Sequence, residues 1–253
     1  ILKKCSGSKL THEAFSRYEN FHLEAEQNIQ DRYSIRCSPQ VLGVIHDNLD
    51  IAKKWIETEI NGVNDNPLID PIGKRIYTSG NFYGGYIAHA MDTMRICVGN
   101  LADLIDKEFG LLVDHKFNKG LGESLKINKK STHHGFKAMQ ITLSSLTADV
   151  IMNTVPASLH SRPTESFNQD KVSMGTTAAL HFAKQLPDLT NMLSIAIIAM
   201  AQAVDLRAKE NCSPVLQAHF DAIRAEVQKL SYDRRMDIDI KVVNEMIRKG
   251  VFA

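Results

Sequence analysis

The chain has 253 residues, of which 43% are hydrophobic and 23% are charged, a composition typical of a folded protein with a sizeable core. Its 30 basic and 29 acidic side chains give a net charge of +1, which argues against a nucleic-acid partner because no broad positive field would attract a polyanion. The four cysteines are widely spaced, as expected for reduced thiols in a cytoplasmic protein and not for a disulfide framework or a metal site.

The start of the chain, Ile1-Leu2-Lys3-Lys4, lacks an initiator methionine and the plan of a signal peptide. We therefore expect the sequence to belong to a longer gene product. The first predicted helix follows Ser38-Pro39, an N-cap residue with proline in the first turn, and its apolar stripe runs from Val41 to Ile60.

One short segment after this helix has the pattern of strands. Leu68-Ile69-Asp70, the turn Pro71-Ile72-Gly73-Lys74, and Arg75-Ile76-Tyr77 predict a small β-hairpin at the edge of a helical bundle. Helical spacing then returns in two apolar stripes, from Ile87 to Leu112 and from Phe136 to Ile151.

The fourth long helix is predicted from about Val172 to Leu206, and it is apolar on nearly all sides between Leu193 and Val204. Its longest apolar run, Met192 to Ala201, is interrupted by Ser194 and is too short to cross a bilayer. We therefore expect a buried core helix and no membrane partner.

Two shorter helices complete the pattern, one after Ser213-Pro214 that reaches Val227 and one from Ile238 to Ile247. Long helices with short connections and a single hairpin predict an all-α, long-helix bundle. Because no low-complexity linker divides the chain, we expect residues 1–253 to form a single helical domain.

Three polar clusters lie between the predicted helices, where binding groups are often mounted on a rigid scaffold. The first is Gln30 to Cys37, in which Arg36 could clamp a carboxylate with two parallel donors while the Tyr33 phenol adds a third. The alternative is an ordinary polar loop that caps the following helix.

The second cluster consists of two loops, Asn61 to Pro67 and Ser79 to Gly85. The second loop sets Phe82 and Tyr83 among three glycines at a helix start, so that backbone and a flat ring could approach a ligand closely. The alternative is a pair of surface turns, for which Asn, Asp and Gly are ordinary residues.

The third cluster is the long polar segment from Pro156 to Ser173. In a purely structural interpretation it forms an N-terminal cap for the next helix, where the negative charge of Asp170 interacts favourably with the positive end of the helix dipole. In the functional interpretation, Glu165 and Gln169 hold an amino group or a polar ring atom.

Taken in order, these motifs resemble the C-terminal half of the histidine, phenylalanine and tyrosine ammonia-lyases and the related aminomutases. The matching blocks are Gln30-Asp-Arg-Tyr33-Ser-Ile-Arg36-Cys, Asn64-Asp-Asn-Pro-Leu, Gly80-Asn81-Phe82, and Asn168-Gln169-Asp with Val172-Ser173-Met174-Gly175. The resemblance implies the fumarase/aspartase-like helical fold of that family. It also implies an enzyme that removes ammonia from an aromatic L-amino acid to give an α,β-unsaturated acid.

Members of the family use a methylidene-imidazolone, an electrophile made from an internal Ala-Ser-Gly. By position, Arg36 resembles the substrate-carboxylate anchor and Tyr33 the tyrosine that hydrogen-bonds near the prosthetic group, with Gln30 supporting them. Phe82 resembles the phenylalanine that packs against the electrophile, and Asn81 lies beside it.

The pocket-lining residues Glu165 and Gln169 match the amine and ring ends of the family's pocket. Gln169 falls where histidine-specific members usually carry a glutamate, which tilts the expected substrate toward phenylalanine or tyrosine. The resemblance further implies a homotetramer, or an assembly with an N-terminal half.

Two features of the family are missing from this sequence. It contains no Ala-Ser-Gly, and no segment matches the family's N-terminal tyrosine base, so we expect this chain alone to be inactive. Cys5-Ser6-Gly7 is a weak substitute, because it lies too close to the Tyr33 block and lacks the Asp-Leu that normally follows.

Two other functions stay open at this point. An aromatic amino-acid 2,3-aminomutase uses the same prosthetic group, and nothing in this stretch separates it from a lyase. A catalytically inactive helical scaffold is a candidate from another class, although it would have no need to keep Tyr33, Arg36, Phe82 and Gln169 together.

Overall fold

The computed structural model describes residues 30–130 and 132–252, so that Cys5-Ser6-Gly7 lies outside the described residues. The chain divides into two compact units. Unit 1 takes its described residues from the ranges 30–37, 104–146 and 190–252, and unit 2 consists of Ser38–Asp103 and Thr147–Leu189. Three helices contribute residues to both units: α5 (Gly85–Val113), α6 (Lys137–Met152) and α7 (Gly175–Arg207).

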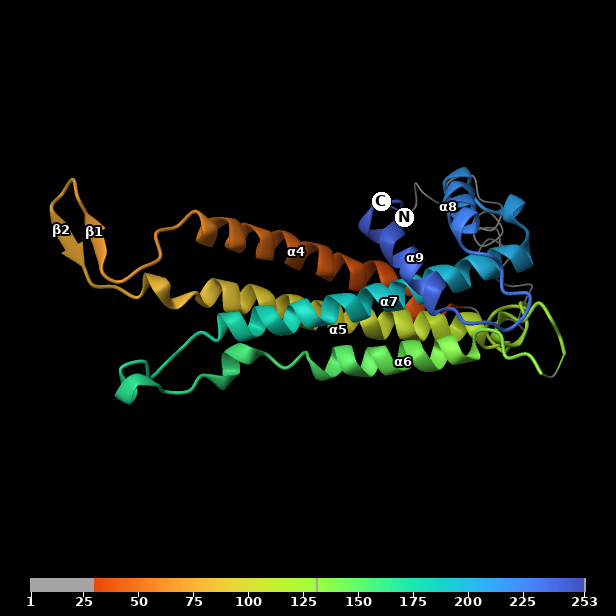
Figure 1. The fold of residues 1–253 in the computed structure, drawn as a ribbon, viewed down its shortest axis with the longest axis horizontal. Helices are drawn as coiled ribbons and strands as arrows, with labels where there is room; N and C mark the ends of the chain where they lie inside the picture. The colour runs from red at the N-terminus through yellow and green to blue at the C-terminus, as the bar shows by residue number, and fades with distance from the viewer. Residues whose placement is uncertain (1–29, 131, 253) are drawn as a thin grey trace. The chain divides into compact units, whose positions relative to one another are not determined.

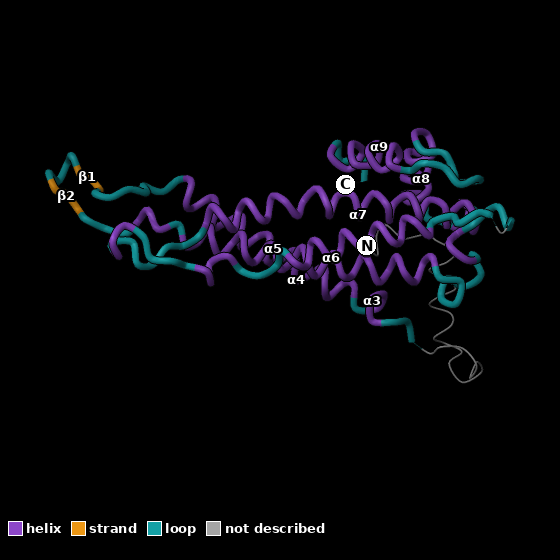
Figure 2. The backbone as a smooth tube through the Cα atoms, turned by 60° about the horizontal axis from the view of Figure 1, so that its bottom comes forward, coloured by secondary structure: helices purple, strands orange, loops and turns teal. Residues whose placement is uncertain are grey.

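Unit 2 is built around α4 (Ser38–Ile60), which lies beside the first part of α5 (Figures 1 and 2). The contact is made by small and flexible side chains, which let the two helices approach closely. Its buried members are Ala52, Ala90, Met94 and Cys97, and Ile45, Trp55, Met91 and Phe182 pack against them. Because Phe182 belongs to α7, the start of that helix joins the same core.

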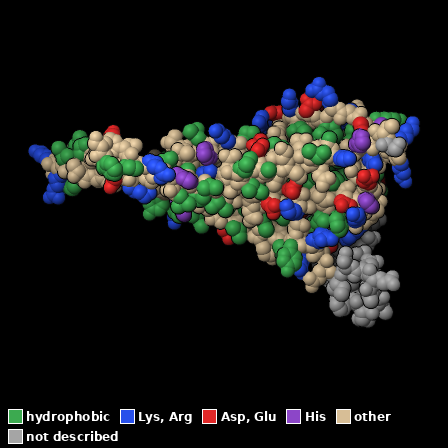
Figure 3. Space-filling model, turned by 90° about the horizontal axis from the view of Figure 1, so that it is seen from below, with side chains coloured by type: hydrophobic (Ala, Val, Ile, Leu, Met, Phe, Trp, Pro, Cys, Tyr) green, Lys and Arg blue, Asp and Glu red, His purple; other side chains and the backbone are tan. Residues whose placement is uncertain are grey.

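The predicted hairpin is confirmed with its predicted bounds. Strands β1 (Leu68–Asp70) and β2 (Arg75–Tyr77) pair antiparallel, and Ile69 lies opposite Ile76. The Asp70 carboxylate accepts hydrogen bonds from the backbone N–H groups of Ile72 and Gly73, which closes the turn. Figure 3 shows hydrophobic and basic side chains gathered around the hairpin.

Unit 1 contains the later parts of α5, α6 and α7 together with three further helices, α3 (Tyr33–Arg36), α8 (Pro214–Glu226) and α9 (Asp237–Arg248). As predicted, α8 starts after Ser213, whose hydroxyl accepts a hydrogen bond from the Leu216 N–H. The largest fully buried apolar side chains of this unit are Phe136, Leu125, Leu143, Met192, Ile195, Val227 and Val243.

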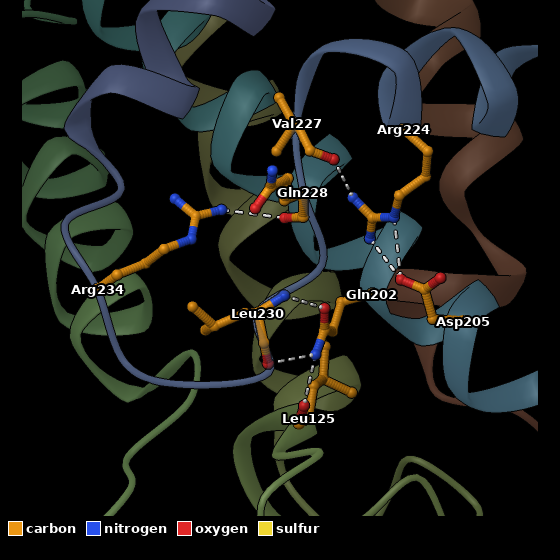
Figure 4. A network of polar contacts seen from close by, with 8 residues as sticks. All are labelled: Leu125, Gln202, Asp205, Arg224, Val227, Gln228, Leu230 and Arg234. Carbon is orange, nitrogen blue, oxygen red and sulfur yellow. Dashed lines mark hydrogen bonds and ion pairs between the residues drawn. The ribbon is translucent and has the colours of Figure 1, made fainter.

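A buried glutamine joins three segments of unit 1 (Figure 4). Gln202 on α7 donates to the carbonyl oxygens of Leu125 and Leu230 and accepts from the Leu230 N–H. Nearby, the Arg224 guanidinium binds the Asp205 carboxylate at 2.7 Å and donates to the Val227 carbonyl oxygen at 3.1 Å. The backbone groups bound in this way lie in segments between helices, where they have no partner in regular secondary structure. The side chains of Gln202 and Arg224 supply the missing hydrogen bonds.

The all-α prediction is confirmed, since the described residues form long helices and one two-stranded sheet. Two local expectations differ. Residues Tyr33 to Arg36 form the one-turn helix α3 directly before α4, where a polar loop was one interpretation. Helix α7 starts at Gly175 and not near Val172, because Met174 has a left-handed φ of 62° that a helix cannot contain.

The apolar stretch of α7 is largely buried, as predicted, and includes Ile195, Ile198 and Ala199. Met200 is the exception, with 52% of its surface exposed. A window of α7 with a mean hydropathy of 1.6 is long and apolar enough to span a membrane, and 44% of that window is buried inside the protein. The core helix of a soluble protein meets the same criterion, so the expected absence of a membrane partner stays a prediction.

Candidate functional site

The first predicted cluster forms a local group of contacts in unit 1. The Arg36 guanidinium donates a hydrogen bond to the side-chain oxygen of Gln30, and its carbon lies 4.4 Å from the centre of the Tyr33 ring. Helix α3 places Tyr33 and Arg36 three residues apart, which puts both side chains on one face of the turn. The structure therefore brings Gln30, Tyr33 and Arg36 together, and Tyr33 is 70% exposed.

This segment is held on the loop that follows α5. The Arg32 guanidinium lies 4.3 Å from the centre of the Phe117 ring, and the Asp31 carboxylate lies 4.0 Å from the Lys119 ammonium. Arg32 and Arg36 therefore both stack on aromatic rings, but only Arg36 also contacts Gln30 among the described residues. A guanidinium held in this way keeps its remaining N–H donors in fixed directions.

The second cluster surrounds a cavity of about 550 Å³ in unit 2. Asn81 lines this cavity, whereas the neighbouring Phe82 is not among the lining residues and is 57% exposed. The lining residues come from the end of α4, the two predicted loops and the start of α5: Trp55, Glu59, Asn64, Gly80, Asn81, Tyr83, Gly84, Gly85, Tyr86 and His89.

The two loops of this cluster are joined, because the Ser79 N–H donates to the Asn66 side-chain oxygen at 3.0 Å. One wall of the cavity is aromatic: the Trp55 ring centre lies 5.8 Å from that of Tyr86 and 5.4 Å from that of His89. Aromatic rings beside the Glu59 carboxylate are groups that would suit a flat ring or a cation.

Sequence reasoning missed Trp55, Glu59, Tyr86 and His89. A signal was available, because Trp55 and Glu59 are four residues apart at the end of one predicted helix. Tyr86 and His89 are three residues apart at the start of the next, beside the same loops. Aromatic and charged residues at those spacings share one helix face.

The third cluster is a closed loop on unit 2. Thr164 and Gln169 pair through their backbones, and the Thr164 hydroxyl donates to the Gln169 side-chain oxygen at 3.0 Å. Glu165, Ser166 and Phe167 between them all have positive φ, from 48° to 69°, a conformation that non-glycine residues adopt at a cost. The loop is exposed at its tip, where Phe167 is 75% accessible.

The second and third clusters approach each other at the start of α7. A Cβ atom at Gly175 would lie 3.5 Å from the Gly84 carbonyl oxygen, so the start of this helix packs closely on the 79–85 loop. Among the described residues, no hydrogen bond joins Glu165 or Gln169 to Asn81 or Phe82. The described residues also contain no group of three or more His, Cys, Asp or Glu side chains suited to a metal ion.

Solved structures share this helical architecture. Tyrosine aminomutase from Streptomyces globisporus superposes with a TM-score of 0.89 at 32% identity, over 99% of this chain and 49% of its own. The fold therefore places this chain in the class of helical lyase and aminomutase scaffolds.

Sequence comparison gives the family. The model of the family described as aromatic amino acid lyase matches residues 1–225. A hal-like protein of Dictyostelium discoideum is 36% identical over 246 residues, which cover 96% of this chain and 46% of the relative. Histidine ammonia-lyase of Burkholderia pseudomallei is 36% identical over 225 residues, covering 89% of this chain and 44% of the relative.

The chain belongs to the aromatic amino acid lyase family. It spans about half the length of the curated relatives that it matches.

Proposed function

We propose that this chain is part of an enzyme that eliminates ammonia from an aromatic L-amino acid and releases an α,β-unsaturated acid. The observation that carries the proposal is the contact of Arg36 with both Gln30 and Tyr33. The amide on one side and the phenol ring on the other limit the conformations of this exposed arginine. Fixed in this way, its donors are ready for a bidentate bond to a substrate carboxylate.

Elimination requires removal of a weakly acidic β-proton, so the substrate has to be held with its Cα–Cβ bond in a defined orientation. In our proposal Arg36 anchors the substrate carboxylate and Gln30 holds Arg36. The Tyr33 hydroxyl donates a hydrogen bond near the prosthetic group. Glu165 and Gln169 line the amine and ring ends of the pocket. Asn81 orients polar groups in the cavity beside Trp55.

The expected prosthetic group is methylidene-imidazolone, which when present supplies the electrophile that activates the amino acid for loss of ammonia. This sequence has no Ala-Ser-Gly from which to form it, so the group would come from another segment or another chain. Tyr33 and Phe82 suit such a group, because the two residues are 70% and 57% exposed and their rings could lie against a flat heterocycle. We assign Phe82 to packing and Tyr33 to hydrogen bonding. We propose no metal.

We further propose that the complete enzyme is a cytoplasmic homotetramer, or an assembly of this chain with an N-terminal half. The 52% exposure of Met200, within the otherwise buried apolar stretch of α7, supports a partner on that face. The free thiols of Cys37, Cys97 and Cys212 support a reducing compartment. Because α5, α6 and α7 each supply residues to both units, we treat the chain as one helical domain.

In this proposal Gln169 determines which aromatic ring the enzyme prefers in its substrate. A neutral amide at this position suits the ring of phenylalanine or tyrosine, whereas a carboxylate would favour the polar imidazole of histidine. An aromatic 2,3-aminomutase is the second candidate, and the likeness to tyrosine aminomutase of Streptomyces globisporus favours it.

The test uses the intact protein, including any chain that completes it, with phenylalanine, tyrosine and histidine as separate substrates. Ultraviolet absorbance follows the unsaturated acid, and chromatography measures any β-amino acid in the same samples. Accumulation of the unsaturated acid supports the lyase, and accumulation of the β-amino acid supports the aminomutase. If all three substrates are returned unchanged by protein shown by mass spectrometry to carry a dehydrated Ala-Ser-Gly, both proposals fail and the inactive scaffold stands.

A further inference from the structure

A buried ion pair lies on α5 within unit 2. The Asp92 carboxylate and the Arg95 guanidinium are three residues apart and 2.7 Å from each other, with 4% and 2% of their side chains exposed. Two charges so far from water are costly unless hydrogen bonds satisfy their remaining donors and acceptors. Most of these bonds go to one other segment of the chain.

That segment begins where α6 ends. One Asp92 oxygen accepts from the Ala157 N–H and the other from the Ser158 N–H, each at 2.9 Å. The Nε atom of Arg95 donates to the Asn153 carbonyl oxygen at 2.8 Å. Three backbone groups within six residues are therefore bound by one ion pair on a neighbouring helix.

Arg95 also reaches α7, since its NH2 group lies 3.2 Å from Nδ1 of His181. A guanidinium can only donate, so Nδ1 of His181 is the acceptor and its ring proton lies on Nε2. The three nitrogens of Arg95 thus point to three different elements: the segment after α6, Asp92 on α5, and His181 on α7. A cavity of about 270 Å³ adjoins this junction and is lined in part by Arg95, Asn153 and His181.

The anchored segment leads into the loop that carries Glu165 and Gln169. Apolar packing does little to hold this loop, because Leu159 and Phe167 are 74% and 75% exposed. Its internal bonds, from the Val172 N–H to the Ser161 hydroxyl and between Thr164 and Gln169, fix its shape. They do not fix its placement on the helices.

We propose that Asp92 and Arg95 are positioning residues that hold the 153–174 loop on α5 and so present Glu165 and Gln169 to the substrate. The effect on catalysis rests on the proposed function, whereas the anchoring of the loop does not. Burial alone would raise the pKa of Asp92, but the hydrogen bonds from Ser158, Ala157 and Arg95 lower it below its ordinary value, so the residue stays an anion.

The chemistry of the pair leaves little room for substitution. Both Asp92 oxygens face only donors, so Asp92→Asn would turn an amide NH2 toward a backbone N–H. Arg95→Lys keeps the positive charge near Asp92 but cannot reach Asn153 and His181 at the same time. The lysine variant therefore separates the effect of the charge from that of the three-way geometry, and it preserves charge balance if Asp92→Asn does not fold.

The experiment is hydrogen–deuterium exchange of the intact protein, read by mass spectrometry in peptides covering 154–171. We expect both variants to exchange at least about tenfold faster in these peptides, while peptides from α4 stay unchanged. Asp205→Asn is the matched control, because it breaks the partly buried pair with Arg224 in unit 1 without touching this loop. Unchanged exchange in 154–171, or an equal rise in the control, would overturn the anchoring role.

Kinetics of the same variants test the second half of the proposal. A displaced loop should raise KM by roughly tenfold or more with a smaller change in kcat, since Glu165 and Gln169 bind the substrate and do not react with it. Faster exchange with unaltered KM and kcat would overturn the role in presenting these residues. Absence of lyase and aminomutase activity in the unsubstituted protein would instead count against the proposed function.

Discussion

The guanidinium carbon of Arg36 lies over the ring of Tyr33, 4.4 Å from the ring centre. This cation–π contact restricts a long and otherwise flexible side chain, because the guanidinium has to stay over the ring face to keep it. The phenol hydroxyl and the guanidinium donors are thereby held in a fixed relation on one turn of helix, as a clamp for a small anion requires.

Replacing this arginine should impair catalysis far more than folding. We expect Arg36→Ala to lower kcat/KM by roughly 30- to 900-fold, or ~2 to 4 kcal/mol, because a bidentate bond to the carboxylate is lost. Arg32→Ala is the matched control, since it removes a guanidinium that stacks on Phe117 in the same segment. Steady-state rates of the intact protein measure both, and equal losses would remove Arg36 from the substrate site.

A single amide should set the preference for the substrate ring. Gln169→Glu keeps an acceptor for the Thr164 hydroxyl, so the loop retains its bond while gaining a negative charge. We expect the ratio of histidine to phenylalanine turnover to rise by about tenfold. Thr164→Val disturbs the same loop without adding charge, and it should slow all substrates alike. An unchanged ratio in Gln169→Glu would falsify the assignment.

Two buried glutamines on α7 should differ in their value to stability. Gln202 and Gln185 are each 1% exposed, but Gln202 makes three hydrogen bonds, whereas Gln185 makes one and its side-chain oxygen has no partner among the described residues. Gln202→Leu should therefore lower the free energy of unfolding by about 3 kcal/mol and Gln185→Leu by about 1 kcal/mol or less. Urea denaturation measures both, and equal losses would mean that the bonds of Gln202 add nothing.

One carboxylate should oppose folding at neutral pH. Burial, and then repulsion from Asp149, raise the pKa of Asp188 above its ordinary value. An acid whose pKa is raised in the folded state binds its proton more tightly there than in the unfolded chain. Keeping Asp188 charged at neutral pH therefore lowers the free energy of unfolding, and this cost disappears as the pH falls through the folded-state pKa. Asp188→Asn should thus be more stable than the native chain at pH 7 and lose that advantage in acid.

The control for this prediction is Asp149→Asn, which removes only the repulsion. It should give a smaller gain than Asp188→Asn, because burial is the larger cause of the shift. Thermal melts across the acid range report both differences. A gain that persists unchanged in acid would point to a cause other than the ionisation of Asp188.

Local chemistry explains which parts of the fold could be predicted from the sequence. The hairpin bounds follow from turn residues around Pro71 and Gly73, and the start of α8 follows from Ser213 before Pro214. The grouping of Gln30, Tyr33 and Arg36 is also local, because these residues lie within seven positions of one another.

Long-range contacts lay beyond such reasoning. Asp92 binds backbone groups 65 and 66 residues further along the chain, and nothing in helical periodicity specifies those partners. Asp92 and Arg95 are two of six charged residues between Ile87 and Leu112, so the sequence pattern did not single them out. The sequence did predict the two loops that line the cavity, but not its aromatic wall, which combines Trp55 of one helix with Tyr86 and His89 of another.

That aromatic wall gives the protein a built-in optical reporter. Trp55 is the one tryptophan in the sequence, so all indole fluorescence of this chain comes from the edge of the cavity. Tyr86, at 5.8 Å between ring centres, lies close enough to pass its excitation energy to the indole, and a molecule that binds against the indole is expected to alter the emission. Occupancy of the cavity can therefore be followed by light alone, without a label and without turnover.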